Sequence, residues 1–285
     1  MTSQQTPTIS RRATRTGVPQ LGHYLSEAFR YRTFAIYWSK ADLKSRNFET
    51  VLGRLWHFLN PLLFGIIYFI FIGILSGDMG NLERLGFIVG NLYVWTYFST
   101  IITTGMGSVQ GGGGGVAAQS AIPRVVLPFA STLTAANLFL RSLVAYVPIH
   151  FIAGRGLHWE MLGLPILIVI TGVFGFGLAL LFAVVNMYFR DVSRLMPHLL
   201  RLWLYLSPAI WAYTRVAGDG LVDTLAKLNP MYWGMTAWTI GFGGPLIDKP
   251  SYWVTIAVFA AVAVVSLGIG FFTFISREDE FAIRV

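Results

Sequence analysis

Six long stretches of this chain are too apolar to face water, and they leave few polar residues for any other surface. Only 12% of the 285 residues are charged and 55% are hydrophobic, whereas a typical soluble protein is about 25% charged. A helix needs about 20 apolar residues to cross a bilayer, and helices keep every backbone group paired in lipid. We therefore expect an all-α integral membrane protein with six transmembrane helices. The six stretches are 55–76, 86–105, 129–153, 161–188, 195–213 and 252–275.

The distribution of lysine and arginine indicates which side of the membrane the termini face. With the amino terminus inside, the inner segments hold 15 of the 21 basic residues, including Arg201 near the inner end of the fifth stretch, and the outer segments hold five, including Arg155. Such an excess is typical of cytoplasmic segments, so both termini are predicted to be cytoplasmic and the protein to lie in the inner cell membrane. The net charge of +8 is expected to attract anionic membrane lipid and no nucleic acid.

The residues before the first stretch divide into two parts. Residues 1–20 are polar and basic, and we expect a disordered cytoplasmic tail with no cleaved signal, because no apolar segment and cleavage site follow Arg11-Arg12. Residues 21–46 carry apolar residues at helical spacing and predict an amphipathic helix in the membrane interface. A helix of a soluble domain is the alternative, but no such domain is present to receive it. The apolar stripe comprises Leu21, Tyr24, Leu25, Ala28, Tyr31, Ala35 and Trp38.

An apolar segment over 225–245 follows the fifth stretch on the outer side. It is too apolar for an exposed loop and too short to cross the bilayer twice, and Asn229-Pro230 and the glycines near its end would break a helix. We expect one or two short re-entrant outer helices that other parts of the protein cover.

The chemistry of a catalytic site is missing from the sequence. The six stretches contain no Asp or Glu, which argues against coupling to protons or sodium ions. The chain has no cysteine, no metal-ligand cluster and no P-loop. We therefore predict no catalytic residue, no metal site and no cofactor in this chain, and any nucleotide energy must come from a separate ATPase subunit.

The run Gly111–Gly115 lies in the predicted cytoplasmic loop between the second and third stretches. It has two interpretations: a flexible tether, or backbone that approaches another surface closely because it lacks Cβ atoms. Residues 118–127 are expected to form a short helix on the inner face of the membrane, interrupted at Pro123 and ended by Pro128.

Arg141 is the one charged residue well inside a predicted span. A central arginine costs about 2.5–3.5 kcal/mol on insertion scales, and no span offers a carboxylate partner. It is either a structural residue bonded to backbone carbonyls or Asn137, or a contact for an anionic substrate group such as a lipid phosphate. Aromatic residues of the first and fifth stretches have similar alternatives: membrane belt, core, or a pore lining that stacks on sugar rings.

Four motifs resemble the permease subunit of ABC-2 type exporters that move lipid-linked polysaccharides such as O-antigen, capsule and teichoic acid. The resemblance covers nearly everything after about residue 21 and implies an ABC-2 type six-helix domain over 47–285. The motifs are DLKSRNFETVLGRLWHFLNPLL (42–63), AIPRVVLPFASTL (121–133), NMYFRDVSRLMPHLLRLWLYLSPAIW (186–211) and LNPMYWGMTAW (228–238).

The resemblance implies a transport subunit that forms a homodimer and binds two copies of an ABC ATPase subunit, which carries the ATP and Mg. The implied substrate is a polyprenyl-pyrophosphate-linked glycan. The stretch RRATRTG and the glycine run resemble actinobacterial members, for which the glycan is cell-wall galactan. An ABC-2 exporter of a small drug or lipid is the alternative. A membrane enzyme acting on prenyl phosphates ranks last, because it would need acidic, metal-binding loops and the carboxylates here are scattered singly or lie in the tail. The tail carboxylates, Glu278, Asp279 and Glu280, are interpreted as a solvated charge run.

The resemblance also implies three functional sites. The ATPase-coupling residues would be Pro123, Arg124, Tyr31, Trp38, Arg190 and Asp191. The residues lining the channel or contacting substrate would be Trp56, Tyr68, Phe71, Trp203, Tyr205, Trp211 and Arg141. The outer gate would comprise Asn229, Pro230, Tyr232 and Trp233.

Overall fold

The computed structural model describes residues 21–45, 55–77, 80–110, 122–212, 218, 220–244, 251–278 and 280–281. Every regular element in these ranges is a helix, which confirms the all-α prediction. The predicted tail over 1–20 and the glycine run 111–115 lie outside the described residues. The helices are α1 (Leu21–Arg30), α2 (Arg32–Ser45), α3 (Trp56–Ser76), α4 (Leu82–Gly107), α6 (Val126–Ile152), η2 (Trp159–Gly163), α7 (Leu164–Tyr188), α8 (Val192–Leu206), α9 (Gly220–Leu228), α10 (Pro230–Gly241) and α11 (Tyr252–Ser276).

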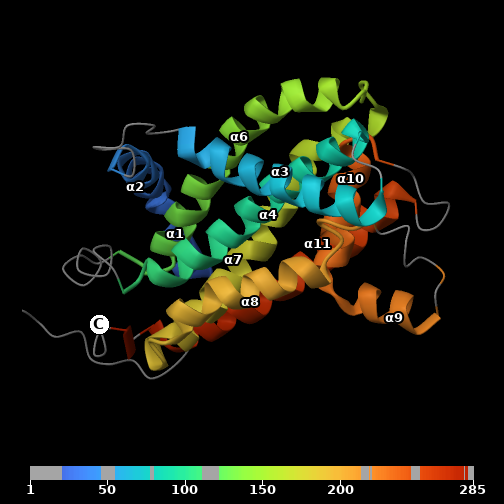
Figure 1. The fold of residues 1–285 in the computed structure, drawn as a ribbon. Coiled ribbons are helices and arrows are strands. Elements are labelled where there is room, and N and C mark those ends of the chain that lie inside the picture. Colours follow the sequence, from blue (N-terminus) through green and yellow to red (C-terminus); the bar gives the residue numbers. More distant parts are fainter. Residues whose placement is uncertain are drawn as a thin grey trace, which may run out of the picture.

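The long helices lie side by side and give the molecule two distinct ends (Figure 1). The first, here the α1 end, holds α1, α2, the start of α8 and the last described residues. The second, here the α9 end, holds α9, α10 and the C-terminal end of α6.

Five helical segments among the described residues are long and apolar enough to cross a membrane. The stretch over 195–213 is the exception, because its helix, α8, ends at Leu206. Ser207 is extended, with φ −108° and ψ 149°, as expected for a residue whose helical conformation clashes with a following proline, here Pro208. The 15 residues of α8 extend about 22 Å, less than the roughly 30 Å of a hydrocarbon core.

Helix α4 lies at the centre of the bundle and α3 at its edge. In their most apolar windows, 72% of the residues of α4 are buried but only 17% of those of α3. Helices α7 and α11 make the most extensive contact of the bundle, and their backbones touch where Gly177 meets Gly270. A Cβ added at Gly270 would overlap the carbonyl oxygen of Gly177, so both positions require glycine, as in other close crossings of membrane helices.

The predicted amphipathic helix is two helices, α1 and α2, joined by a turn at Tyr31. Tyr24 and Ala35 of the predicted stripe are buried, whereas Leu21 and Leu25 are exposed. Helix α2 lies against α6, where Thr134 donates from Oγ1 to Oγ of Ser39 at 3.1 Å. The stripe therefore packs largely on the protein itself.

Pro128 does not end a helix, contrary to the prediction for residues 118–127. It lies in the first turn of α6, where a proline is tolerated because the first N–H groups of a helix have no intrahelical acceptor. Helix α6 therefore begins at Val126, three residues before the predicted span.

One or two short helices are expected within 225–245; α10 lies inside these bounds, whereas α9 begins before them, at Gly220. Helix α10 begins with Asn229 as its N-cap and Pro230 at its first position, the arrangement these residue types favour. Nearly all of α10 is buried, and Trp238 donates from Nε1 to Oγ1 of Thr171 on α7 at 3.0 Å. Other helices thus cover α10, as the prediction required, whereas no residue of α9 is buried.

Candidate functional site

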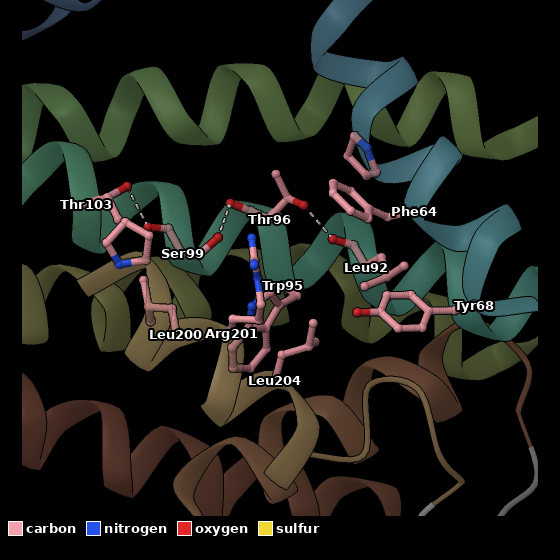
Figure 2. Close-up of a pocket in the computed structure, with 12 residues that line it drawn as sticks. Phe64, Tyr68, Leu92, Trp95, Thr96, Ser99, Thr103, Leu200, Arg201 and Leu204 are labelled. Atoms are coloured by element: carbon pink, nitrogen blue, oxygen red, sulfur yellow. Dashed lines mark hydrogen bonds between the residues drawn. The ribbon is translucent and has the colours of Figure 1, made fainter. Parts of the chain in front are cut away.

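A groove of about 250 Å³ lies between α3, α4 and α8 (Figure 2). Its position follows from the fold: α4 is fixed in the core, while α3 and α8 lie outside it and leave the groove open along one side. The lining residues are Pro61, Phe64, Tyr68, Leu92, Trp95, Thr96, Ser99, Thr103, Pro197, Leu200, Arg201 and Leu204.

Two tyrosines connect α3 to α8 beside the groove. The hydroxyl groups of Tyr68 and Tyr205 are 2.7 Å apart and share a hydrogen bond, and their rings meet edge to face. Tyr205 remains 44% exposed, so this bond is reachable from outside. Sequence reasoning placed both residues on a channel lining, and the structure brings them together.

One side of α4 gives the groove a polar strip that the sequence analysis missed. Thr96, Ser99 and Thr103 line the groove at helical spacing, and each donates its hydroxyl hydrogen to a carbonyl of its own helix at 2.7–3.2 Å. Their oxygens keep lone pairs that can accept hydrogen bonds. Polar residues recurring three and four positions apart in an apolar helix are the pattern that would have predicted this strip.

Arg201 is the cation of this groove. Figure 2 shows its side chain pointing from α8 into the space beside α4. The sequence analysis counted Arg201 only as a residue of the inner membrane interface. Together with the aromatic and hydroxyl groups, it gives the groove the means to bind a polar or anionic molecule with apolar faces.

The other predicted lining residues are dispersed. Trp203 packs inward, with its ring 5.3 Å from Phe98 and 6.3 Å from Trp95 between centroids. Trp211 donates from Nε1 to the carbonyl of Tyr205 at 3.0 Å. The side chains of Trp56 and Phe71 are exposed on α3, outside the groove lining.

Arg141 lies away from the groove, on an exposed position of α6. Asn137, its expected partner, donates instead to the carbonyl of Leu133 at 3.0 Å. Within the described part of the chain, Arg141 forms no hydrogen bond or ion pair, so the structural role expected for it is not seen.

The predicted outer-gate residues gather where α8, α9 and α10 meet. The Asn229 side chain forms hydrogen bonds with the indole N–H of Trp203, the carbonyl of Leu206 and the backbone N–H of Met231. Trp233 donates from Nε1 to the carbonyl of Lys227 at the end of α9, at 2.9 Å. The side chain of Tyr232 is buried. The segment is thus fastened to the end of α8.

At the α1 end, the residue predicted to couple to an ATPase, Arg124, is bound to the carboxyl-terminal segment. Its backbone N–H donates to Oε1 of Glu278 at 2.7 Å, and its Nη1 donates to the carbonyl of Glu278 at 3.2 Å. Tyr24 of α1 lies beside the same carboxylate. Burial raises the pKa of the Tyr24 phenol, and the neighbouring Glu278 raises the pKa further, so this hydroxyl remains neutral.

Glu280 is bound as well. Tyr188, the last residue of α7, donates to its Oε2 at 2.5 Å, and Nη1 of Arg277 lies 2.8 Å from its Oε1. The interpretation of Glu278 and Glu280 as a solvated charge run is therefore wrong. These carboxylates join α11 to α7 and to the start of α6, while Asp279 lies outside the described residues.

The remaining coupling candidates lie at the same end of the molecule. Tyr31 and Trp38 are half-buried against a cluster that contains Val125, the neighbour of Arg124. Arg190 and Asp191 are exposed in the turn between α7 and α8. The buried Pro123 immediately precedes Arg124. All six predicted coupling residues therefore lie at the α1 end, although not all of them contact one another.

The sequence matches known proteins over most of its length. The sequence profile of the family described as ABC-2 type transporter matches residues 36–243. An O-antigen export system permease protein RfbA of Myxococcus xanthus is 28% identical over 264 residues, which cover 90% of this chain and 96% of the relative. Two Klebsiella pneumoniae proteins with the same description are 29% identical over 174 residues and 25% identical over 234 residues, covering 60% and 81% of this chain and 66% and 87% of the relatives.

Proposed function

The chain belongs to the ABC-2 type transporter family, and from this premise we propose that it is the membrane-spanning subunit of an ATP-driven exporter of a lipid-linked polysaccharide. The observation that carries the proposal is the groove between α3, α4 and α8. It combines aromatic rings, hydroxyl groups and one arginine, which suit a molecule with apolar sugar faces, hydroxyl groups and phosphate. The relatives named as O-antigen export permeases support the same substrate class.

The size of the groove supports a homodimer. Ligand pockets usually measure about 300–1,000 Å³, and the groove of about 250 Å³ in one copy is smaller. Its open side is flanked by α3, whose Ile67, Phe71 and Ile74 are exposed. A second copy facing this side would enclose a continuous channel between the two grooves.

The ATPase subunit would bind at the α1 end. The sequence contains no P-loop, so this chain requires a separate subunit to bind ATP and Mg. Arg190 and Asp191 are exposed there for contact, and Arg124 connects the predicted coupling loop to α11 through Glu278. Both termini are proposed to be cytoplasmic, in agreement with the distribution of basic residues.

The finer proposal is that the glycan is a galactan, as the resemblance to actinobacterial members implies. This proposal can be tested by comparing galactan with other substrates that share the polyprenyl pyrophosphate anchor. A small drug or an ordinary lipid is the competing substrate class.

Co-purification with the ATPase encoded nearest to this chain tests the proposal. The complex, reconstituted in lipid, should hydrolyse ATP faster when extracted lipid-linked galactan is added than when the anchor lipid alone is added. If only another lipid-linked glycan stimulates ATP hydrolysis, that glycan replaces galactan as the proposed substrate and the proposed exporter function stands. Stimulation by drugs or ordinary lipids only would favour the competing class, and a chain that purifies without any ATPase would overturn the proposal.

A further inference from the structure

A second, smaller pocket of about 180 Å³ lies at the α9 end, away from the groove. Its lining comes from the start of α4, the segment after α6, the segment after α8 and α10. Its lining residues are Asn81, Glu83, Arg84, Phe87, Arg155, Ala212 and Thr239. Two arginines thus line a small pocket that the transport proposal does not use.

Arg155 is buried and has no carboxylate partner among the residues that the structure describes. Its side chain is only 6% exposed. Nη1 donates to the carbonyl of Phe242 at 2.9 Å and Nη2 to the carbonyl of Glu83 at 3.3 Å, while Nε has no acceptor in the described part of the chain. These neutral carbonyls satisfy some of its hydrogen atoms, but no described residue balances its positive charge. Buried charges in proteins are normally paired, because an unpaired one loses its hydration without compensation.

The surrounding structure is shaped to hold this guanidinium in place. A Cβ added at Gly86 would lie 2.6 Å from Cβ of Ala153 and 3.6 Å from Nε of Arg155, so only glycine leaves room there. The hydroxyl of Tyr146 lies beside the guanidinium and donates to the carbonyl of Gly86 at 3.0 Å. The cation is therefore held by a built site rather than placed by chance on a surface.

The rim of the pocket also favours an anion. Arg84 lines it and donates from Nη1 to Oγ of Ser76 at 2.8 Å. Asn81 caps α4, and the positive end of this 26-residue helix faces the pocket. Among the described residues that line the pocket, the opposing charge is the Glu83 carboxylate, which lies in an exposed position and forms no ion pair with Arg155.

We propose that this pocket binds a phosphate group, with Arg155 as its buried anchor and Arg84 at its rim. Guanidinium groups pair with phosphate oxygens through parallel hydrogen bonds. A single phosphate group or a diphosphate matches the size of the pocket. Near a membrane surface this chemistry has two sources: the headgroup of an anionic lipid, or the diphosphate of a transported lipid. The pocket would hold either one beside α10, the helix that carries the predicted gate residues Pro230, Tyr232 and Trp233.

Thermal unfolding of the purified full-length chain in lipid nanodiscs tests the proposal. In phosphatidylcholine discs, inorganic pyrophosphate is titrated at constant ionic strength, which keeps screening equal. In a second arm, phosphatidylglycerol replaces part of the phosphatidylcholine. We expect the unfolding midpoint to rise in at least one arm, since a ligand that binds only the folded state stabilises it. A rise with phosphatidylglycerol alone assigns the pocket to a headgroup, and a rise with pyrophosphate alone assigns it to a diphosphate.

Four variants show whether the effect belongs to this pocket. Arg155→Lys keeps the charge but loses the two parallel N–H donors of the guanidinium. This variant and Arg84→Gln should each raise the half-saturating concentration of the effective anion, pyrophosphate or phosphatidylglycerol, at least tenfold. Glu83→Gln should lower it, because it removes a repelling charge. Arg194→Gln, on the exposed surface at the α1 end, should leave it unchanged.

Three results would overturn the proposal. They are the absence of a midpoint shift in both arms, an equal shift in wild type and Arg84→Gln, and a large loss of stability in Glu83→Gln without added anion. The last would identify Glu83 itself as the counter-charge of Arg155. Arg84 and Glu83 lie at the rim of the pocket. If Arg155→Lys does not fold, the variants of these two residues still test the proposal.

Discussion

Trp203 donates its indole N–H to Oδ1 of Asn229 at 2.7 Å, and this bond joins α8 to the start of α10. The same oxygen accepts from the backbone N–H of Met231 at 3.0 Å. The amide nitrogen of Asn229 donates to the carbonyl of Leu206 and to Oγ of Ser207, both at 3.0 Å. One side chain thus fastens the predicted outer gate to the end of the helix that borders the groove.

Replacement of Asn229 tests how firmly this connection holds. Asn229→Ala leaves the indole N–H of Trp203 without its acceptor and removes the cap of α10. A lost buried partner costs about 1–3 kcal/mol and a lost N-cap about 1 kcal/mol, so we expect stability to fall by roughly 2 kcal/mol or more. Asn229→Asp keeps the acceptor and should lose less. Thermal unfolding in detergent measures both.

Asn137→Ala is the matched control, because Asn137 is exposed and donates only to Leu133 of its own helix. We expect its stability to change by less than about 0.5 kcal/mol. Equal losses in Asn229→Ala and Asn137→Ala would show that the connection contributes nothing measurable.

The sequence predicted the long helices well because their signal is local. Apolar runs of sufficient length correspond to α3, α4, α6, α7 and α11. It overextended the helix at 195–213, where the single step from Ser207 to Pro208 ends the helix within an apolar run.

The site was less accessible to sequence reasoning, because its contacts join residues far apart in the chain. Glu278 binds Arg124 across 154 positions, and Tyr68 binds Tyr205 across 137. Composition alone predicts that the tail carboxylates are solvated, because no residue near them in the sequence indicates a partner. Arg155 was counted only as an outer charge for the same reason.

Glu278 is predicted to transmit movement between the coupling loop and α11. Glu278→Ala removes the acceptor for the backbone N–H of Arg124, whereas Arg124→Ala leaves that bond in place. We therefore expect Glu278→Ala to lower export per ATP hydrolysed more than Arg124→Ala does. The ATPase rate and the exported glycan are measured in the same cells or vesicles. A larger effect of Arg124→Ala would assign the coupling role to its side chain instead.

The tyrosine pair is predicted to hold α3 against α8 in the resting state. Tyr68→Phe and Tyr205→Phe each remove the bond at 2.7 Å, and the double variant can remove it only once. The effect of the double variant on export should therefore be smaller than the sum of the single effects, with a coupling of about 0.5–1.5 kcal/mol. Additive effects would mean that the two hydroxyls act separately, for example on the glycan.

The proposed homodimer can be tested by cysteine cross-linking, because the chain has no native cysteine. Single cysteines along the exposed side of α3, at Ile67, Phe71 and Ile74, should form covalent dimers under mild oxidation at those positions closest to the dimer axis. Disulfides require Cα atoms within about 7 Å. Val144→Cys on the exposed side of α6 is the control. Cross-linking through Val144 but through no position of α3 would place the interface on α6.

Arg141 is predicted to be dispensable for export. It lies on an exposed position of α6, away from the groove, whereas Arg201 lines the groove. Replacing an exposed arginine near the centre of a span removes an insertion penalty of about 2.5–3.5 kcal/mol. Arg141→Leu should therefore insert at least as well as wild type and export within about twofold of it, while the matched Arg201→Leu should lose most export. Membrane-integrated protein and exported glycan are measured together for both variants. Loss of export in Arg141→Leu with normal insertion and ATPase binding would restore the hypothesis that Arg141 contacts an anionic substrate group, and would place α6 on the translocation path.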